Sequence, residues 1–151
     1  MSNLQGKQAE FMVAGEQRLY MINDMLKLTS TPEQLMLYMN LCEEEFKELE
    51  DSFEVFMKAV REDEKIAALA DLLDAVCDLT YVLMGLCNSA GLPFHEAFDE
   101  VHRANMAKFE RQDDGTYKIL RRVDGKIVKP KDWKAPNIIN ILKYRLIQQI
   151  A

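Results

Sequence analysis

Glycine, proline and histidine are scarce in this sequence. Among 151 residues there are six Gly, four Pro and two His. Few turn-forming residues disfavour a fold of many short strands, and long runs with apolar periodicity favour helices. Neither His95 nor His102 follows a glutamate by three residues, so the sequence lacks the paired Glu-x-x-His motifs of a di-iron bundle.

Cysteines and long hydrophobic runs are also limited. Cys42, Cys77 and Cys87 lie in expected helices without a CxxC pair, which favours reduced, buried thiols over disulfides or metal ligands. Three aspartates interrupt the most apolar run, so we expect no membrane-spanning segment. The first residues lack the basic-then-apolar pattern of a signal peptide, and we expect a cytoplasmic protein.

The net charge of −6 is unevenly distributed along the chain. Residues 117–151 contain nine Lys or Arg and two Asp, whereas residues 1–116 contain ten basic and twenty-three acidic residues. An acidic body disfavours binding to nucleic acid, and a basic tail indicates contact with an anion or with acidic surface. We therefore expect neither a nucleic-acid partner nor a membrane partner.

Apolar periodicity predicts four helices, at about residues 4–26, 32–60, 66–90 and 94–109. Thr31 is the expected cap of the second helix, with Gln34 completing a capping box, and residues 61–65 form a charged linker. Gly91 is expected to end the third helix.

Two Asp-Gly pairs follow these helices and predict a short hairpin or extended arm, and Pro136 opens an expected last helix. The prediction is an all-α, antiparallel four-helix bundle. The whole chain, 1–151, is expected to form one domain, with the bundle at about 4–110 and the basic arm and C-terminal helix at about 111–151.

The run CEEEFKELED contains six acidic residues among ten. On a helical wheel, Glu45 lies within the apolar arc of its helix, with Glu48 and Glu44 at the edge of that arc. The other acidic residues of the run point elsewhere, as solvated charges. The run is therefore divided between a wet face and a face turned towards the core.

Three aspartates are the only charged residues between Ile66 and Ala90. Asp71, Asp74 and Asp78 share one arc of a helix that is otherwise apolar nearly all round, which predicts a buried helix. Buried like charges are costly without a cation, and oxygen ligands suit Mg²⁺ or Mn²⁺. The alternative is an acidic stripe that faces solvent on the rim of the bundle.

Glu44-Glu45-x-x-Glu48 followed by Asp71-Leu-Leu-Asp74 resembles the EExxE…ExxD signature of the all-α nucleotide pyrophosphohydrolases. That superfamily includes MazG, the dimeric dUTPases and phosphoribosyl-ATP pyrophosphohydrolase. The likeness continues in DLLDAVCDLTYVLMG, VHRANMAKF and VDGKIVKPKDWKAPNI, and covers about residues 35–139. The tail looks closest to small MazG-like proteins, often associated with phages. The sequence departs from the signature at Asp71, where the family usually has a glutamate.

The resemblance implies roles for individual residues. It implies that Glu45, Glu48, Asp71 and Asp74 bind Mg²⁺, and Asp78 can share this role. The candidate acceptor of the proton of water is Glu44, with Glu45 as the alternative. The candidates for substrate binding are Asn105 and Lys108, the tail lysines Lys126 and Lys129 near the phosphates, and Gln17 and Trp133 at the base or sugar. Without the resemblance, the Asn and Lys candidates are interpreted as a polar helix face and a solvated arm.

The implied activity is hydrolysis of a nucleoside triphosphate between the α and β phosphates, giving a nucleoside monophosphate and pyrophosphate, in nucleotide-pool house-cleaning. The family also implies a homodimer or homotetramer. Two alternatives remain open. One is the same fold acting on phosphoribosyl-ATP or another phosphorylated substrate, and the other is a non-enzymatic helical assembly whose carboxylates bind a structural cation or none.

Overall fold

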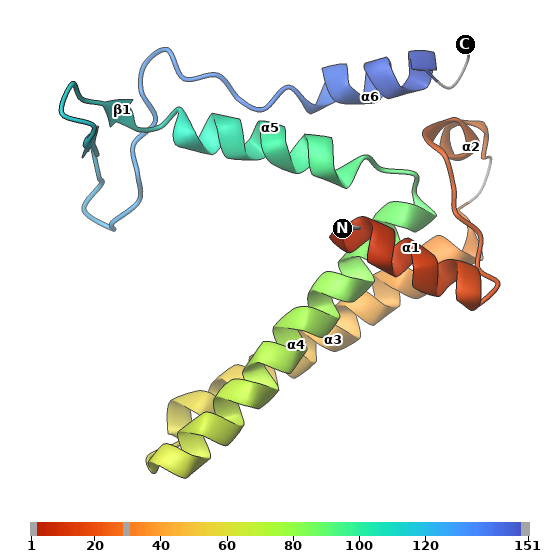
Figure 1. Ribbon diagram of the computed structural model, residues 1–151, viewed down its shortest axis with the longest axis horizontal. Coiled ribbons are helices and arrows are strands. Elements are labelled where there is room, and N and C mark those ends of the chain that lie inside the picture. The colour runs from red at the N-terminus through yellow and green to blue at the C-terminus, as the bar shows by residue number, and fades with distance from the viewer. Residues whose placement is uncertain (1–2, 29–30, 149–151) are drawn as a thin grey trace. The chain divides into compact units, whose positions relative to one another are not determined.

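The computed structural model describes residues 3–28 and 31–148, and it consists mainly of helices (Figure 1). This confirms the expected all-α class. No described helix is long and apolar enough to cross a membrane. The elements, in chain order, are α1 (Leu4–Ala14), α2 (Ile22–Lys27), α3 (Glu33–Lys58), α4 (Glu62–Ser89), α5 (Phe94–Met106), β1 (Glu110–Arg111), β2 (Tyr117–Lys118) and α6 (Ile138–Gln148).

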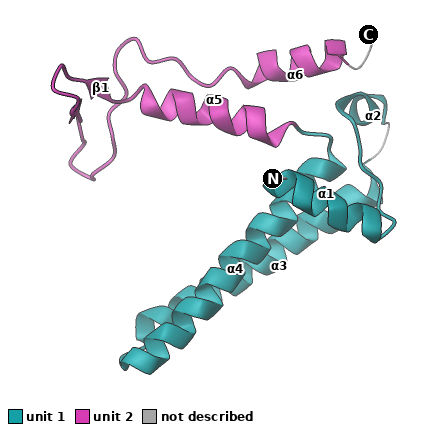
Figure 2. Cartoon of the chain, viewed as in Figure 1, with its two compact units in different colours: residues 1–92 teal, residues 93–151 magenta. Residues whose placement is uncertain are grey.

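The chain divides into two compact units, which Figure 2 colours separately. Unit 1 comprises residues 1–92, with α1 to α4. Unit 2 comprises residues 93–151, with α5, the two short strands and α6. The complete four-helix arrangement stays a prediction.

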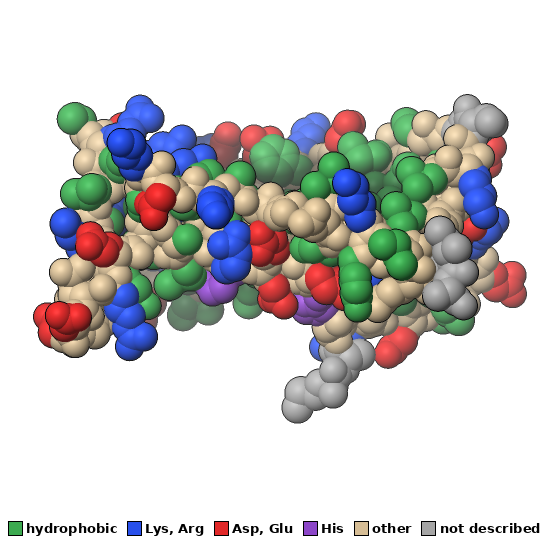
Figure 3. All heavy atoms as spheres, turned by 90° about the horizontal axis from the view of Figure 1, so that it is seen from above, with side chains coloured by type: hydrophobic (Ala, Val, Ile, Leu, Met, Phe, Trp, Pro, Cys, Tyr) green, Lys and Arg blue, Asp and Glu red, His purple; other side chains and the backbone are tan. Residues whose placement is uncertain are grey.

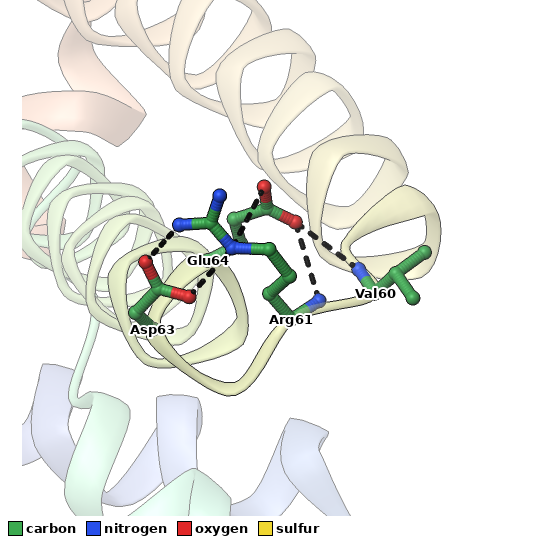
Figure 4. A network of polar contacts seen from close by, with 4 residues as sticks. All are labelled: Val60, Arg61, Asp63 and Glu64. Atoms are coloured by element: carbon green, nitrogen blue, oxygen red, sulfur yellow. Dashed lines mark hydrogen bonds and ion pairs between the residues drawn. The ribbon is translucent and has the colours of Figure 1, made fainter.

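Unit 1 is built on a long hairpin of α3 and α4, and α1 packs against α4 (Figure 1). The two long helices are antiparallel because only three residues connect them. At this turn the carboxylate of Glu64 accepts hydrogen bonds from the backbone N–H groups of Val60 (3.4 Å) and Arg61 (3.2 Å) (Figure 4). The side chain of Arg61 forms an ion pair with Asp63. The charged residues expected to form a linker therefore form the first turn of α4, where acidic side chains suit the helix dipole.

The end of the hairpin that contacts α1 is closely packed. Tyr38 from α3, Met12 from α1 and Val82 from α4 form its buried core. The Tyr38 ring lies directly against Gly85 of α4, and a Cβ atom at Gly85 would overlap that ring. A glycine in the middle of a helix is unfavourable by itself, so this close approach is the physical reason for Gly85.

A polar network joins α1, α3, α4 and the segment after α1 at the same end. Gln8 Nε2 donates a hydrogen bond to the hydroxyl of Tyr38 (2.9 Å), and that hydroxyl donates to Gln17 Oε1 (2.7 Å). Asn88 Nδ2 donates to Gln8 Oε1 (2.9 Å). Gln8 has no exposed surface and Asn88 is also buried, so these bonds satisfy groups that would otherwise destabilise the core. The network fixes α1 on the hairpin.

The first expected helix is interrupted in the structure. Gly15 ends α1, where its N–H donates to the carbonyl of Phe11 (2.9 Å), and Glu16 adopts a left-handed conformation with φ of 57°. An extended segment follows before α2 begins at Ile22. The prediction of one helix over residues 4–26 was wrong because apolar periodicity continued across Gly15.

The start of the second expected helix also differs in detail. Pro32, rather than Thr31, is the residue that precedes α3, and no side chain caps this end. The side chain of Gln34 has other partners. Its Nε2 donates to the carbonyl of Arg18 (2.6 Å) and to Ser89 Oγ (3.1 Å), and its Oε1 accepts from the N–H of Arg18 (3.0 Å). Gln34 therefore holds the extended segment after α1 instead of completing a capping box.

The other end of the hairpin leaves much apolar surface open. Ile66 and Leu73 of α4 are each 64% exposed, and Phe53 of α3 is 52% exposed. Hydrophobic side chains are exposed elsewhere too, on the face drawn in Figure 3, which views the molecule from above and not from this end of the hairpin. The sequence predicted that the helix at about residues 66–90, which is α4, is buried. This prediction is wrong for the single chain.

Unit 2 contains α5, α6 and the expected short hairpin between them. The first Asp-Gly pair forms the turn between β1 and β2, and the second forms a separate turn closed by an isolated bridge of Arg121 and Ile127; Gly115 and Gly125 have φ of 84° and 82°. Gly91, with φ of 63°, follows the end of α4 as predicted. A Cβ atom at Gly91 would overlap the backbone of Met21, whereas Gly115 and Gly125 have open space at that position.

Charged contacts attach α6 and the segment before it to α5. Glu100 accepts two hydrogen bonds from the guanidinium of Arg103 (2.7 and 2.8 Å) and one from the N–H of Asn137 (2.8 Å). Arg145 of α6 forms an ion pair with Glu96. The hydrogen bonds to Glu100 lower its carboxyl pKa to about 2, with Arg103 as the largest cause.

Candidate active site

The acidic run of α3 places one carboxylate in a partly buried position. Glu45 is half-buried, whereas Glu44 and Glu48 are exposed. Leu41 and Cys42, one turn before Glu45, pack against the buried core. The inward position of Glu45 therefore agrees with the helical wheel.

The three aspartates of α4 are all exposed in the single chain. Asp71, Asp74 and Asp78 are followed along the helix by Tyr81 and Gly85, the latter beneath the Tyr38 ring. Because these aspartates are open to water, burial alone does not require a cation beside them. The sequence indicates a cation because these aspartates are expected to lie on a buried helix. In the single chain this reason no longer applies.

The electrostatics nevertheless connect the two acidic faces. Partial burial is the largest cause that raises the pKa of the Glu45 carboxyl, and the negative charges of Glu48, Asp78 and Glu44 follow. Asp78 belongs to α4, so the hairpin brings carboxylates from both helices close enough to repel. The result is a local negative potential centred on Glu45.

The six candidate carboxylates lack cationic partners. Within residues 3–28 and 31–148, no ion pair or hydrogen bond involves the side chains of Glu44, Glu45, Glu48, Asp71, Asp74 or Asp78. Among the same described residues, no three acidic, histidine or cysteine side chains converge closely enough to hold a metal ion. Carboxylate oxygens suit a hard divalent cation. In this conformation, however, the six carboxylates of one chain are too far apart to surround a metal ion.

Gln17 lies beside the buried network of unit 1. Its side-chain oxygen accepts the hydrogen bond from the Tyr38 hydroxyl, and Gln17 is half-buried. Burial is the largest cause that raises the pKa of Tyr38, which therefore remains a neutral donor at physiological pH. In this structure the amide oxygen of Gln17 accepts a hydrogen bond that stabilises the packing of unit 1.

Unit 2 gathers four of the other candidates. Lys108 Nζ donates a hydrogen bond to Asn105 Oδ1 (2.6 Å) at the end of α5. Trp133 Nε1 donates to the carbonyl of Ala104 (2.6 Å). Lys129 Nζ lies 4.0 Å from the centroid of the Trp133 ring, and Lys108 Nζ lies 6.0 Å from it. Asn105, Lys108, Lys129 and Trp133 therefore form one cluster.

Lys126 is exposed, and its backbone follows the turn at Asp124-Gly125, beyond the hairpin, where Arg121 and Ile127 form an isolated antiparallel bridge. Its N–H donates to Asp124 Oδ1 (3.2 Å), and its carbonyl accepts from the N–H of Arg122 (2.8 Å). These contacts hold the backbone of Lys126 at this turn.

Sequence reasoning missed the residues that support these candidates. Gln8 and Asn88 were given no role, although both belong to the network around Tyr38. The glycine at position 85, within a helix and on the arc of the aspartates, was a usable signal for a close approach. No sequence pattern indicated that Trp133 would bond the end of α5.

Comparison with known proteins adds one positive finding. The family described as phosphoribosyl-ATP pyrophosphohydrolase matches residues 25–105, which is more than half of the chain. The match contains all six candidate carboxylates and ends at Asn105, before the basic arm. A search of curated proteins finds no match.

Proposed function

Because the chain belongs to the phosphoribosyl-ATP pyrophosphohydrolase family and is therefore a pyrophosphohydrolase, we propose that it hydrolyses nucleoside triphosphates between the α and β phosphates. The products are a nucleoside monophosphate and pyrophosphate, and the role is house-cleaning of the nucleotide pool. The observation that carries this proposal is the set of unpaired carboxylates on the α3–α4 hairpin, within the residues that match the family.

The reaction requires an attack by water on the α phosphorus. The bond from the α phosphorus to the bridging oxygen breaks, and that oxygen leaves with pyrophosphate. Glu44 is the proposed acceptor of the proton of water, and Glu45 is the alternative. The raised pKa of Glu45 makes it a stronger base than an ordinary glutamate once it is ionised.

The proposed cofactor is Mg²⁺, with Mn²⁺ as a substitute. Glu45, Glu48 and the α4 aspartates would hold it. Asp78 is the α4 residue best supported, because its charge acts on Glu45. When bound, the metal neutralises phosphate charge and lowers the pKa of a coordinated water.

The lysines of unit 2 would supply the positive charge that the phosphate groups of the substrate require. Asn105, Lys108, Lys126 and Lys129 are proposed to bind the substrate, with the lysines on the phosphates. Ammonium groups stabilise the negative charge that develops on departing pyrophosphate. Contacts of Gln17 and Trp133 with the base or sugar would require both side chains to change their present hydrogen bonds.

A screen for pyrophosphate release tests the activity. Ribonucleoside and deoxyribonucleoside triphosphates are incubated with the protein and Mg²⁺, and the products are separated. Hydrolysis in ¹⁸O-labelled water should place the label in the monophosphate, because water attacks the α phosphorus. Absence of pyrophosphate from every nucleotide, or label in pyrophosphate, would contradict the proposed reaction.

The second candidate substrate is phosphoribosyl-ATP. It is favoured by the description of the matching family, which names that compound. It contains the same triphosphate, so the proposed chemistry is unchanged. Including it in the screen decides between the two substrates, since the ratio of kcat/KM values measures the preference directly.

We also propose that the protein is a homodimer or homotetramer through the open face of the hairpin. Exposed apolar patches of this kind mark interaction surfaces, and a second hairpin would cover them. A neighbouring subunit would also add charged groups near the acidic residues, where one chain leaves the geometry unfinished.

Light scattering after size-exclusion chromatography tests the assembly. Phe53→Glu places a charge on the open apolar face and should shift the protein towards the monomer. Asn40→Glu adds the same charge at an exposed polar position of α3 and serves as the control. A wild-type protein that is monomeric at all concentrations would contradict this part of the proposal.

A further inference from the structure

The indole of Trp133 has two separate contacts in unit 2. Its N–H donates to the carbonyl of Ala104, which is buried (1% exposed) and belongs to the last turns of α5. Its ring lies under the ammonium group of Lys129. A single side chain therefore connects the basic arm to the end of α5.

The geometry of the two lysines follows from this connection. Lys129 Nζ is 4.0 Å from the ring centroid, within the range of a cation–π interaction, and Lys108 Nζ is 6.0 Å from it, at the limit of that range. Lys108 is also held by its hydrogen bond to Asn105. Two positive charges are thus kept near one ring face or edge, although they repel each other.

Among the described residues, no carboxylate forms an ion pair with Lys108 or Lys129. In the described part of unit 2, Glu96, Glu100, Glu110 and Asp124 form ion pairs with other basic residues. Asp132 lines a cavity of about 380 Å³ together with Lys108, and no ion pair joins them among the described residues. The cluster of Lys108 and Lys129 thus retains its positive charge for an external anion.

We propose that Trp133 is a positioning residue, which holds the ammonium groups of Lys108 and Lys129 as one binding pair for a pyrophosphate group. This inference rests on the proposed function for the identity of the anion. The ring attracts both cations through its quadrupole, and the bond to Ala104 fixes the ring. The anion therefore meets two charges already in position, which lowers the entropy lost on binding.

The chain contains one tryptophan, so its fluorescence reports on this cluster alone. The probe is inorganic pyrophosphate, added with a chelator so that no divalent metal is present. Binding should change the emission of Trp133 saturably, because the ammonium group on the ring is drawn to the anion. The measurement needs no turnover.

Variants separate the pair from general electrostatic attraction. Lys129→Ala should weaken pyrophosphate binding about 5- to 10-fold, since it removes one charged hydrogen-bond donor. Lys131→Ala removes an exposed charge of the same arm and should change binding less than about 2-fold. Asp132→Asn should strengthen binding, because it removes a nearby negative charge.

Calorimetry tests Trp133 itself, since its replacement removes the fluorescence signal. Trp133→Leu should weaken binding about 3- to 10-fold, and Trp133→Phe should recover part of this loss because it keeps an aromatic ring. Thermal unfolding of each variant shows whether unit 2 remains folded, and Trp133→Phe provides the comparison if Trp133→Leu does not.

The possible outcomes are distinct. Saturable binding that Lys129→Ala and Trp133→Leu weaken, and Lys131→Ala does not, supports the inference even if no nucleotide is hydrolysed, in which case the proposed function alone fails. Absence of pyrophosphate binding overturns the inference. Equal losses for Lys129→Ala and Lys131→Ala, or full affinity in both Trp133 variants, would also overturn it.

Discussion

Unit 1 and unit 2 differ in the sign of their charge and in how they leave that charge available. Unit 1 contains seven basic and seventeen acidic residues, whereas unit 2 contains twelve basic and eight acidic residues. In unit 1 the candidate carboxylates form no ion pair with any of the described residues, and the charges of Glu48, Asp78 and Glu44 act on Glu45. In unit 2 several carboxylates are paired, and Lys108 and Lys129 remain on the Trp133 ring.

The comparison shows that the two units hold their charged side chains in position by different means. Unit 1 presents repelling carboxylates on regular helices, whose backbone hydrogen bonds hold them at fixed spacing. Unit 2 presents Lys129 on an irregular arm, where no helical hydrogen bonds fix its position. Side-chain contacts such as that with Trp133 take over this role. A metal-bound phosphate chain contains both signs of charge and is complementary to both kinds of surface.

The largest expected effect concerns the carboxylates of the hairpin. Glu48→Gln and Asp78→Asn should each lower pyrophosphate release at least about 100-fold, because each removes a charge proposed to hold the metal. Glu50→Gln, an exposed position of the same helix, should leave the rate nearly unchanged. Initial rates at saturating Mg²⁺ provide the measurement. Equal rates for Asp78→Asn and Glu50→Gln would remove Asp78 from the site.

The close contact between the two long helices gives the next largest effect. Gly85→Ala should destabilise unit 1 by about 1–3 kcal/mol, because the added Cβ overlaps the Tyr38 ring. Gly15→Ala places its Cβ 3.4 Å from the nearest atom and should be nearly neutral. Urea unfolding followed by circular dichroism measures both. An unchanged or increased stability of Gly85→Ala would mean that the hairpin separates easily at this point.

Repulsion among the carboxylates predicts a gain in stability when one is neutralised. Without metal, Glu45→Gln should raise the thermal midpoint by roughly 1–3 °C, since surface charge pairs contribute up to about 1 kcal/mol. Added Mg²⁺ should stabilise the wild type more than this variant. Differential scanning fluorimetry with Mg²⁺ and with a chelator makes the comparison, and Glu43→Gln is the control. A lower midpoint for Glu45→Gln would show that its charge is already compensated.

The smallest expected effect is the acid response of unit 2. Hydrogen bonds lower the pKa of Glu100 to about 2, from an ordinary 4.5, so its contribution to stability is complete above pH 4.5. This contribution is lost as the pH falls towards 2. Glu100→Gln should therefore flatten the pH dependence of unfolding in this interval. Trp133 fluorescence follows unit 2, and an unchanged slope would show that Arg103 and Asn137 do not favour the charged form.

Helix positions could largely be predicted from the sequence, and the breaks between them less well. The third expected helix and Gly91 at its end agree closely with α4, because apolar periodicity and a left-handed glycine are local signals. The interruption after Gly15 was missed because Gln34 and Asn88 stabilise the extended segment from distant positions.

The candidate site could be predicted by residue type better than by arrangement. Spacing on the wheel identified Glu45 as the inward carboxylate. It also implied that α4 is buried, whereas Ile66, Leu73 and the three aspartates of α4 are exposed, because local periodicity does not say what packs against a helix. Lys108 and Lys129 both lie near the ring of Trp133, whose indole bonds Ala104, 29 residues earlier in the chain, and no local pattern encodes such a contact.

The glycines of positive φ differ in a way that concerns chirality. Gly115 and Gly125 need a backbone conformation that disfavours L-residues, but a Cβ atom at either position would meet open space, so only the handedness of the backbone opposes an L-alanine there. At Gly91 the backbone of Met21 occupies the space as well. There, an L-alanine is opposed twice, by the handedness of the backbone and by the volume that its Cβ atom would need, so glycine is required for two separate reasons.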